Sequence, residues 1–188
     1  MIKNFKNIIF LSIPVSLIVL FSACPTPQQY SEIPEIKFKQ VELYDTIDDP
    51  VLENPVKVYK LRFGIIDGDG DIGLNLEDTL GLEIDSIYVN NFISALYEIK
   101  NGDTIFIADS LDSYNYRVPY VVPQGQNKTL IADIYINYEF LYQDDTLLYD
   151  SVLFIFYMID RAINKSNVEK TPVLKLDTIG LFPQNFVE

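Results

Sequence analysis

The feature that most limits the fold of this chain is a series of short segments rich in Val, Ile, Tyr and Phe, separated by turn residues. Such segments favour β-strands, and helical periodicity is hard to find among them. The expected strands cover residues 56–66, 91–100, 104–108, 129–140, 150–159 and 172–176. We therefore predict an all-β fold, an antiparallel two-layer β-sandwich.

Two local patterns locate strands within this fold. Asn101-Gly102-Asp103 separates two expected strands, and Asn-Gly readily adopts the positive φ angles of tight turns, so we expect a β-hairpin there. Residues 151–159 are apolar almost without interruption, which indicates a central strand that is covered on both faces.

The N-terminal segment follows a different pattern. Lys3 and Lys6 precede an apolar run over residues 8–21, which ends in small residues just before Cys24. This order is typical of a signal peptide, and the run is shorter than the roughly 20 apolar residues of a membrane-spanning helix. We expect export with cleavage before Cys24. An ordinary secretory peptide with an incidental cysteine is the alternative.

Phe21-Ser22-Ala23-Cys24 resembles the lipobox of bacterial lipoproteins. The resemblance implies that Cys24 carries acyl chains such as palmitate, and two or three chains anchor a protein durably in a membrane. Because Cys24 is the single cysteine, no intrachain disulfide is expected. The expected parts of the chain are a signal peptide at 1–23, a lipidated Cys and Pro-rich extended tether at 24–35, a β-sandwich domain at 36–177 and a C-terminal tail at 178–188.

Residues 160–167, Asp-Arg-Ala-Ile-Asn-Lys-Ser-Asn, follow the expected central strand. They resemble the Asp-x-Ala-Gly-Asn-x-Ser turn near the end of many bacterial immunoglobulin-like domains, with Ile163 in place of Gly. Together with residues 63–74, they make the chain similar to a family of small Bacteroidota lipoproteins of uncharacterised function. The resemblance implies an exported immunoglobulin-like β-sandwich in which this turn is structural, and it names no reaction.

Charge and the tether narrow the expected partners and location. The net charge of −13 disfavours binding to nucleic acid. Residues 25–30 carry no acid, whereas surface-exported lipoproteins of Bacteroidota tend to carry acidic residues just after the cysteine. The resemblance therefore implies the cell envelope, with the lipid anchor in the outer membrane and the domain facing the periplasm. The expected partner is an envelope protein or a glycan.

Asp67, Asp69 and Asp71 alternate with glycines, and alternate carboxylates in such a loop can turn inward around a hard cation such as Ca²⁺. The stretch 63–99 contains no Lys or Arg to neutralise them. Candidate supplementary ligands are Asn75, Glu77 and Asp78. We expect Ca²⁺ as the one cofactor, bound to stiffen the loop. The alternative is a glycine-rich β-turn with solvated carboxylates.

Aspartate followed by Ser or Thr and then by an aliphatic residue recurs along the chain. This tripeptide resembles the acceptor motif of the O-glycosylation system that Bacteroidota apply to exported proteins. The hydroxyl residues are Thr46, Thr79, Ser86, Thr104, Ser110, Thr146, Ser151 and Thr178. A turn that ends in Asp before a new strand would give the same tripeptide, so we expect glycan at one or two surface sites.

Catalysis finds little support, because the chain has no histidine and its single cysteine is expected to be acylated. We therefore expect no enzyme but a binding or assembly module. The alternative is a small carboxylate-dependent glycoside hydrolase or a glycan-binding accessory protein. Tyr114, Tyr116, Arg117 and Tyr120 form an aromatic and cationic cluster in a segment between expected strands, where a loop could stack on sugars or hold a protein partner. The alternative is that the tyrosines are exposed strand residues.

Overall fold

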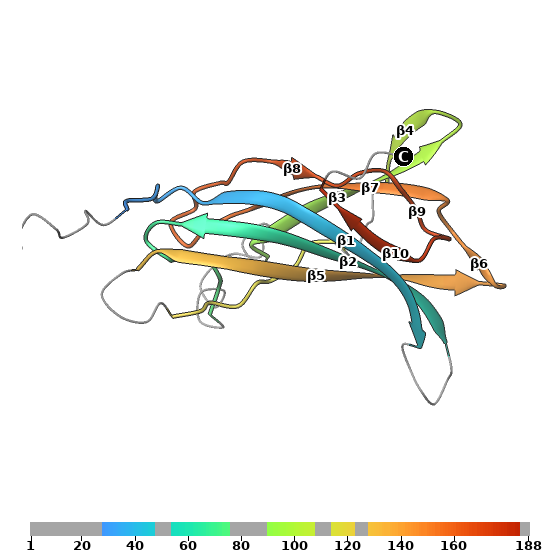
Figure 1. Cartoon of the computed structure of the whole chain (residues 1–188), viewed down its shortest axis with the longest axis horizontal. Coiled ribbons are helices and arrows are strands. Elements are labelled where there is room, and N and C mark those ends of the chain that lie inside the picture. Colours follow the sequence, from blue (N-terminus) through green and yellow to red (C-terminus); the bar gives the residue numbers. More distant parts are fainter. Residues whose placement is uncertain (1–27, 48–53, 76–89, 108–113, 123–127, 185–188) are drawn as a thin grey trace, which may run out of the picture.

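The computed structural model describes residues 28–47, 54–75, 90–107, 114–122 and 128–184. In these ranges the chain forms β-strands in two antiparallel sheets that pack together, as Figure 1 shows. The predicted all-β sandwich is confirmed. The described ranges contain no helix that could span a membrane.

The first sheet has the strand order β10-β1-β2-β5-β6. Its long strands are β1 (Glu35–Ile47), β2 (Pro55–Asp67) and β5 (Leu130–Gln143). Two short strands, β10 (Gly180–Pro183) and β6 (Thr146–Leu147), complete its edges. Buried and more exposed residues alternate along much of the long strands, because successive residues of a strand point to opposite faces of the sheet.

The second sheet is built around β7 (Ser151–Met158), which lies between β3 (Phe92–Lys100) and two short strands. β8 (Glu169–Lys170) and β9 (Leu174–Lys175) pair with different parts of β7. β7 is therefore central, as predicted. However, on its outer face only Ser151 is buried and the other residues are half-buried, so the expectation that both faces are covered is met only in part.

Aromatic side chains from both sheets fill the core. The rings of Tyr138 and Phe154 stack with centroids 3.9 Å apart, and Phe63 stacks on Phe92 with centroids 5.3 Å apart. Each of these four residues is at most 1% exposed. Truncation of such a ring to Ala typically costs about 3–5 kcal/mol, so these contacts hold the two sheets together.

The hairpin predicted at Asn101-Gly102-Asp103 is present. It joins β3 to β4 (Asp103–Phe106), with Lys100 opposite Asp103 in the register. Asn101 and Gly102 have φ angles of 55° and 87°, so both turn residues adopt the left-handed backbone that Asn and Gly tolerate best.

Two strands lie outside the segments that we expected. β1 forms in residues 35–47, where no strand was predicted, and it pairs along its length with β2. β10 lies beyond residue 177, where the domain was expected to end, and it pairs with residues 40–43 of β1. The predicted C-terminal tail is therefore wrong for residues 180–183, which belong to the first sheet.

Candidate metal centre

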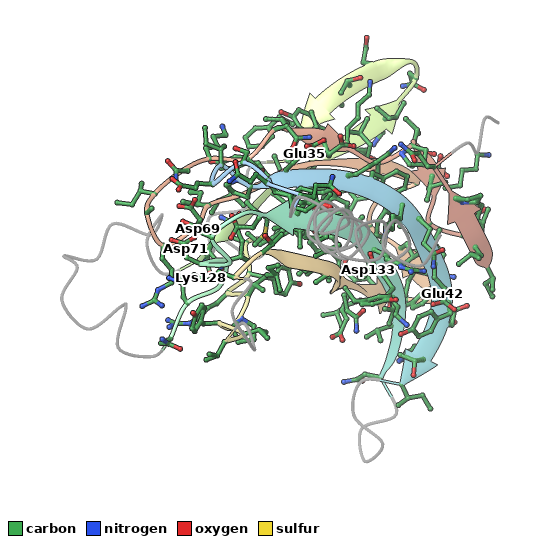
Figure 2. The ribbon with its side chains drawn as sticks, turned by 60° about the vertical axis from the view of Figure 1, so that its left-hand side comes forward. Glu35, Glu42, Asp69, Asp71, Lys128 and Asp133 are labelled. Atoms are coloured by element: carbon green, nitrogen blue, oxygen red, sulfur yellow. The ribbon has the colours of Figure 1, made fainter. Side chains whose placement is uncertain are left out.

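Asp67, Asp69 and Asp71 lie where β2 ends and the next loop begins. Asp67 is the last residue of β2 and is 0% exposed. Asp69 and Asp71 are half-buried, and Figure 2 shows them beside each other at one end of the sandwich. The strand therefore fixes the first carboxylate, and the loop brings the other two toward it.

Glycines allow this loop to turn in a confined space. Gly70 and Gly73 have φ angles of 67° and 97°, in the left-handed region that favours glycine. A Cβ atom at Gly68 would lie 2.5 Å from the main-chain oxygens of Tyr30 and Ser31. The N–H of Gly68 instead donates a hydrogen bond of 2.8 Å to the oxygen of Ser31. The alternation of Asp and Gly thus has a steric cause.

The three carboxylates converge. One ligand oxygen from each lies within 4.8 Å of those of the other two. Oδ1 of Asp67, Asp69 and Asp71 is in each case buried without a hydrogen-bond partner, although Oδ2 of Asp67 accepts a hydrogen bond of 3.3 Å from the N–H of Ile72. Buried carboxylate oxygens without donors are costly, and one hard cation satisfies several of them at once. The residues present therefore fit Ca²⁺.

The crowded charges also disturb one another. Burial, followed by repulsion from Asp69 and Asp71, raises the pKa of Asp67 to about 7. Burial raises the pKa of Asp71 as well, and the charges of Asp160 and Asp69 add to this effect. Main-chain hydrogen bonds from Ala162 and Arg161 offset it only in part. A cation would favour the ionised carboxylates and so reverse these shifts.

Asp160 belongs to the turn that follows β7. It is 3% exposed and accepts hydrogen bonds from the main-chain N–H and the Nδ2 of Asn164, at 2.6 and 2.8 Å. The turn is therefore held by an Asp side chain, as expected. Ile163 has a φ angle of 68°, the conformation that Gly would adopt without strain. We predicted Asp160 only as a turn residue, and its effect on Asp71 could not be anticipated because it depends on contact between distant segments.

Asn167 joins the same turn to the first sheet. Its Oδ1 accepts a hydrogen bond of 2.8 Å from the N–H of Ile36, and its Nδ2 donates one of 2.9 Å to the oxygen of Ile36. The bonds cross from the second sheet to β1. The turn after β7 thus connects the sheets near the end that carries the aspartates.

The supplementary ligands predicted from the sequence are not brought into the centre. Asn75 is exposed, and its main-chain oxygen accepts a hydrogen bond from Nη2 of Arg117. Glu77 and Asp78 lie outside the described residues. The described centre therefore consists of Asp67, Asp69 and Asp71, and water or main-chain oxygens would have to complete the six to eight ligands that Ca²⁺ takes.

Tyr114 and Tyr116, half of the predicted recognition cluster, are half-buried and pack against the core. Their rings contact Tyr138 with centroids 6.1 and 5.5 Å away, and the hydroxyl of Tyr116 donates a hydrogen bond of 2.8 Å to the oxygen of Asn137. Packing therefore explains both tyrosines without a ligand.

The other two members of that cluster lie toward the loop end. Arg117 contacts Asn75, and the ring of Tyr120 faces the guanidinium of Arg161 at 4.7 Å. Leu74 bridges to Pro119 in the same region. These contacts join the segment 117–120 to residues that follow β2 and β7, whereas Tyr114 and Tyr116 pack against Tyr138.

The predicted acceptor hydroxyls differ in accessibility. Thr46, Thr104 and Thr146 are exposed, Thr178 is half-buried, and Ser151 is 7% exposed at the start of β7. Burial removes Ser151 as an acceptor in the folded domain. The remaining predicted acceptors, Thr79, Ser86 and Ser110, lie outside the described residues.

The expected signal peptide and Cys24 also lie outside the described residues. Comparison of the chain with protein-family models, with curated proteins and with solved structures finds no match. The geometry of the described residues therefore supplies the argument for function.

Proposed function

We propose that the chain is a lipid-anchored, non-catalytic module of the bacterial cell envelope, in which Ca²⁺ stabilises one end of a β-sandwich. The observation that carries the calcium site is the convergence of three carboxylates, each with a buried oxygen that has no hydrogen-bond partner. The lipobox-like sequence that ends at Cys24 supports the anchor, and the absence of histidine supports a non-catalytic role. Exposed Thr46, Thr104 and Thr146 remain proposed glycan acceptors.

The ion would act as a link between the two sheets. Asp67 ends β2 in the first sheet, whereas Asp71 lies against the turn that follows β7 in the second sheet. In the metal-free protein the carboxylates repel one another and oppose this contact. A divalent cation would replace repulsion with attraction and fix the ends of both strands, which suits a module that presents a rigid surface.

Thermal unfolding in EDTA and in Ca²⁺ tests the site. For a ligand that binds only the folded state, Ca²⁺ at about a hundred times Kd adds about 2.7 kcal/mol to the free energy of unfolding. In a domain of this size the melting temperature should rise by several degrees. Mg²⁺ should stabilise less, because it requires near-octahedral geometry and gives up water reluctantly.

Variants assign the effect to the three aspartates. Asp69→Asn should reduce the calcium-induced shift, and Asp67→Asn combined with Asp71→Asn should nearly abolish it. Asp103→Asn is the matched control, because it removes the same charge from an exposed position on β4 and should leave the shift unchanged. Equal shifts in all four proteins would show that calcium acts elsewhere.

A further inference from the structure

A second feature lies at the other end of the sandwich. A cleft of about 630 Å³ is lined by residues from both sheets, among them Asp45, Lys57, Glu98, Tyr142, Asp150 and Asp177. Lys57 lies near the start of β2 and Asp67 at its end, so at roughly 3.3 Å per residue the cleft and the candidate metal centre are about 30 Å apart. In Figure 1, β1 and β2 curve away from β3 and β4 at this end.

Glu98 points into this cleft from the core face of β3. It is 8% exposed, and its cross-strand neighbours are the aliphatic residues Val152 and Ile105. Among the described residues no hydrogen bond or ion pair joins its carboxylate to another side chain or to the main chain. Its carboxylate is reached from the cleft, so Glu98 offers an acceptor there that no donor of the described residues occupies.

Lys57, the buried basic residue of the cleft, already has partners within the protein. Lys57 is 1% exposed, and its Nζ lies 2.8 Å from Oδ1 of Asp45 and 3.3 Å from the main-chain oxygen of Thr178. The hydroxyl of Tyr142 donates a hydrogen bond of 2.7 Å to the same Asp45 oxygen. Burial opposes the charge of Asp45, but the hydrogen bonds from Lys57 and Tyr142 lower its pKa, so Asp45 remains ionised and holds Lys57.

The other charged residues leave an excess of negative charge. Asp145, Asp150 and Asp177 line the cleft together with Glu98, and Lys100 is the further basic residue of the lining. Asp150 accepts a hydrogen bond of 3.0 Å from the hydroxyl of Ser151, which leaves its charge uncompensated. The lining therefore attracts cations.

We infer that this cleft binds a basic side chain of a partner protein, a guanidinium or an ammonium group, with Glu98 as its counter-ion. The residues of the cleft do not form a close group of metal-ligand atoms in the described part of the chain, and the space is far larger than a metal ion requires. The hydroxyls of a neutral glycan could donate hydrogen bonds to Glu98 but would leave its charge uncompensated, whereas a guanidinium offers it a bidentate, charge-assisted pair.

Tyr142 and Tyr149 complete the site on its aromatic side. Both line the cleft, and aromatic rings favour the apolar stem and the cationic head of Arg. The inference rests on the proposed role as a binding module and specifies the chemistry of its partner. It does not require calcium, because the two sites lie at opposite ends of β2.

Calorimetric titration with a short peptide tests the inference. The full chain in detergent would be titrated, at low ionic strength, with acetyl-Gly-Arg-Gly-amide and with the same peptide carrying citrulline, the neutral isostere of Arg. We expect the Arg peptide to bind at least tenfold more tightly than the citrulline peptide. Equal affinities, or binding of a neutral oligosaccharide in place of the Arg peptide, would overturn the inference.

Variants assign the binding to the cleft. Glu98→Gln should weaken the Arg peptide at least tenfold, whereas Glu35→Gln, an equal charge change at an exposed position on β1, should alter its affinity less than twofold. Asp150→Asn with Asp177→Asn changes two exposed residues and should weaken binding severalfold, so a folding defect in Glu98→Gln does not remove the test. Unchanged affinity in this double variant would contradict the inference.

The same titration in EDTA separates the two proposals. We expect the affinity for the Arg peptide to change less than twofold when calcium is removed, because the cleft is remote from Asp67. If calcium does not raise the melting temperature but the Arg peptide still binds, only the metal centre is contradicted. Loss of peptide binding in both buffers would contradict the cleft alone.

Discussion

At the scale of single residues, Asp67 is the least ordinary position in the described chain. It continues the row of core-facing residues of β2, yet it is a carboxylate with 0% exposure. Burial and the neighbouring aspartates raise its pKa to about 7 from the ordinary value of 3.8. The folded, metal-free protein therefore retains a proton that the unfolded chain releases.

This shift predicts how stability depends on pH. In EDTA the free energy of unfolding should fall as the pH rises from about 4 to about 7, because the folded state binds more protons than the unfolded state over that window. Above the raised pKa the loss is complete. Chemical denaturation at several pH values measures it, and Asp67→Asn should flatten the curve. The assignment would be contradicted if the free energy of unfolding in EDTA rose over this window and Asp67→Asn removed the rise.

Ile163 offers a second test at this scale. It is a β-branched residue with a φ angle of 68° and is 62% exposed. Left-handed backbone costs a non-glycine residue roughly 1–2 kcal/mol. Because glycine loses more conformational entropy on folding, which offsets part of this strain relief, Ile163→Gly should stabilise the fold by about 0.5–1 kcal/mol. The midpoint of urea unfolding measures the change. Ile179→Gly, at an equally exposed position without positive φ, should not stabilise.

At the scale of strands, β10 is the element whose role is most readily tested. It pairs with β1, Phe182 packs against the core, and the N–H of Gln184 donates a hydrogen bond of 2.8 Å to the oxygen of Lys39. A chain that ends at residue 177 should lose about 1–2 kcal/mol, since full burial of a Phe side chain contributes roughly 1.5–3 kcal/mol. A chain that ends at residue 184 is the control. Equal unfolding midpoints for the two chains would show that β10 is dispensable.

The sequence predicted the elements whose signals are local. The hairpin at Asn101-Gly102 and the central strand β7 have distinctive residues within a few positions, and both are present. β1 also carries a local signal, an alternation of apolar and charged residues such as Ile36, Lys37 and Phe38, but this signal is shorter than the apolar runs of the predicted strands. β10 has four residues, of which two are exposed, and it becomes a strand only because β1 lies beside it.

In the candidate sites too, only the features that depend on neighbouring residues in the sequence could be predicted. Asp67, Asp69 and Asp71 are close in sequence, so their convergence could be predicted. The influence of Asp160 on Asp71 and the position of Glu98 in a cleft could not, because both depend on how distant segments pack. The prediction of a recognition cluster at Tyr114 and Tyr116 rests on residue type alone, whereas tertiary packing places both rings against Tyr138.

At the scale of the whole molecule, the proposed protein has a lipid anchor near its N-terminus, a metal centre at one end of the sandwich and an acidic cleft at the other end. The acidic chain, with a net charge of −13, would be repelled by anionic membrane surfaces, so the proposed attachment would depend on the lipid rather than on the domain. A domain held in this way would keep its cleft free to bind the proposed basic partner.

Cys24→Ser tests the anchor. Without the thiol no acyl chain can be attached, so the variant should lose fatty-acid labelling and move from the membrane fraction to the soluble fraction. Lys6→Gln is a milder control that keeps the cysteine and should leave labelling in place. Membrane association that persists in Cys24→Ser would contradict lipidation as the means of attachment.

The central claim, that the three aspartates form a calcium site, is tested most directly by a crystal structure of the domain grown with Ca²⁺. The account predicts an ion bound by at least one oxygen from each of Asp67, Asp69 and Asp71, at about 2.3–2.6 Å. It also predicts an anomalous signal at that position, which disappears in crystals of the Asp67→Asn and Asp71→Asn double variant. Carboxylates bonded only to water or main-chain N–H groups, with no ion at millimolar calcium, would contradict the account.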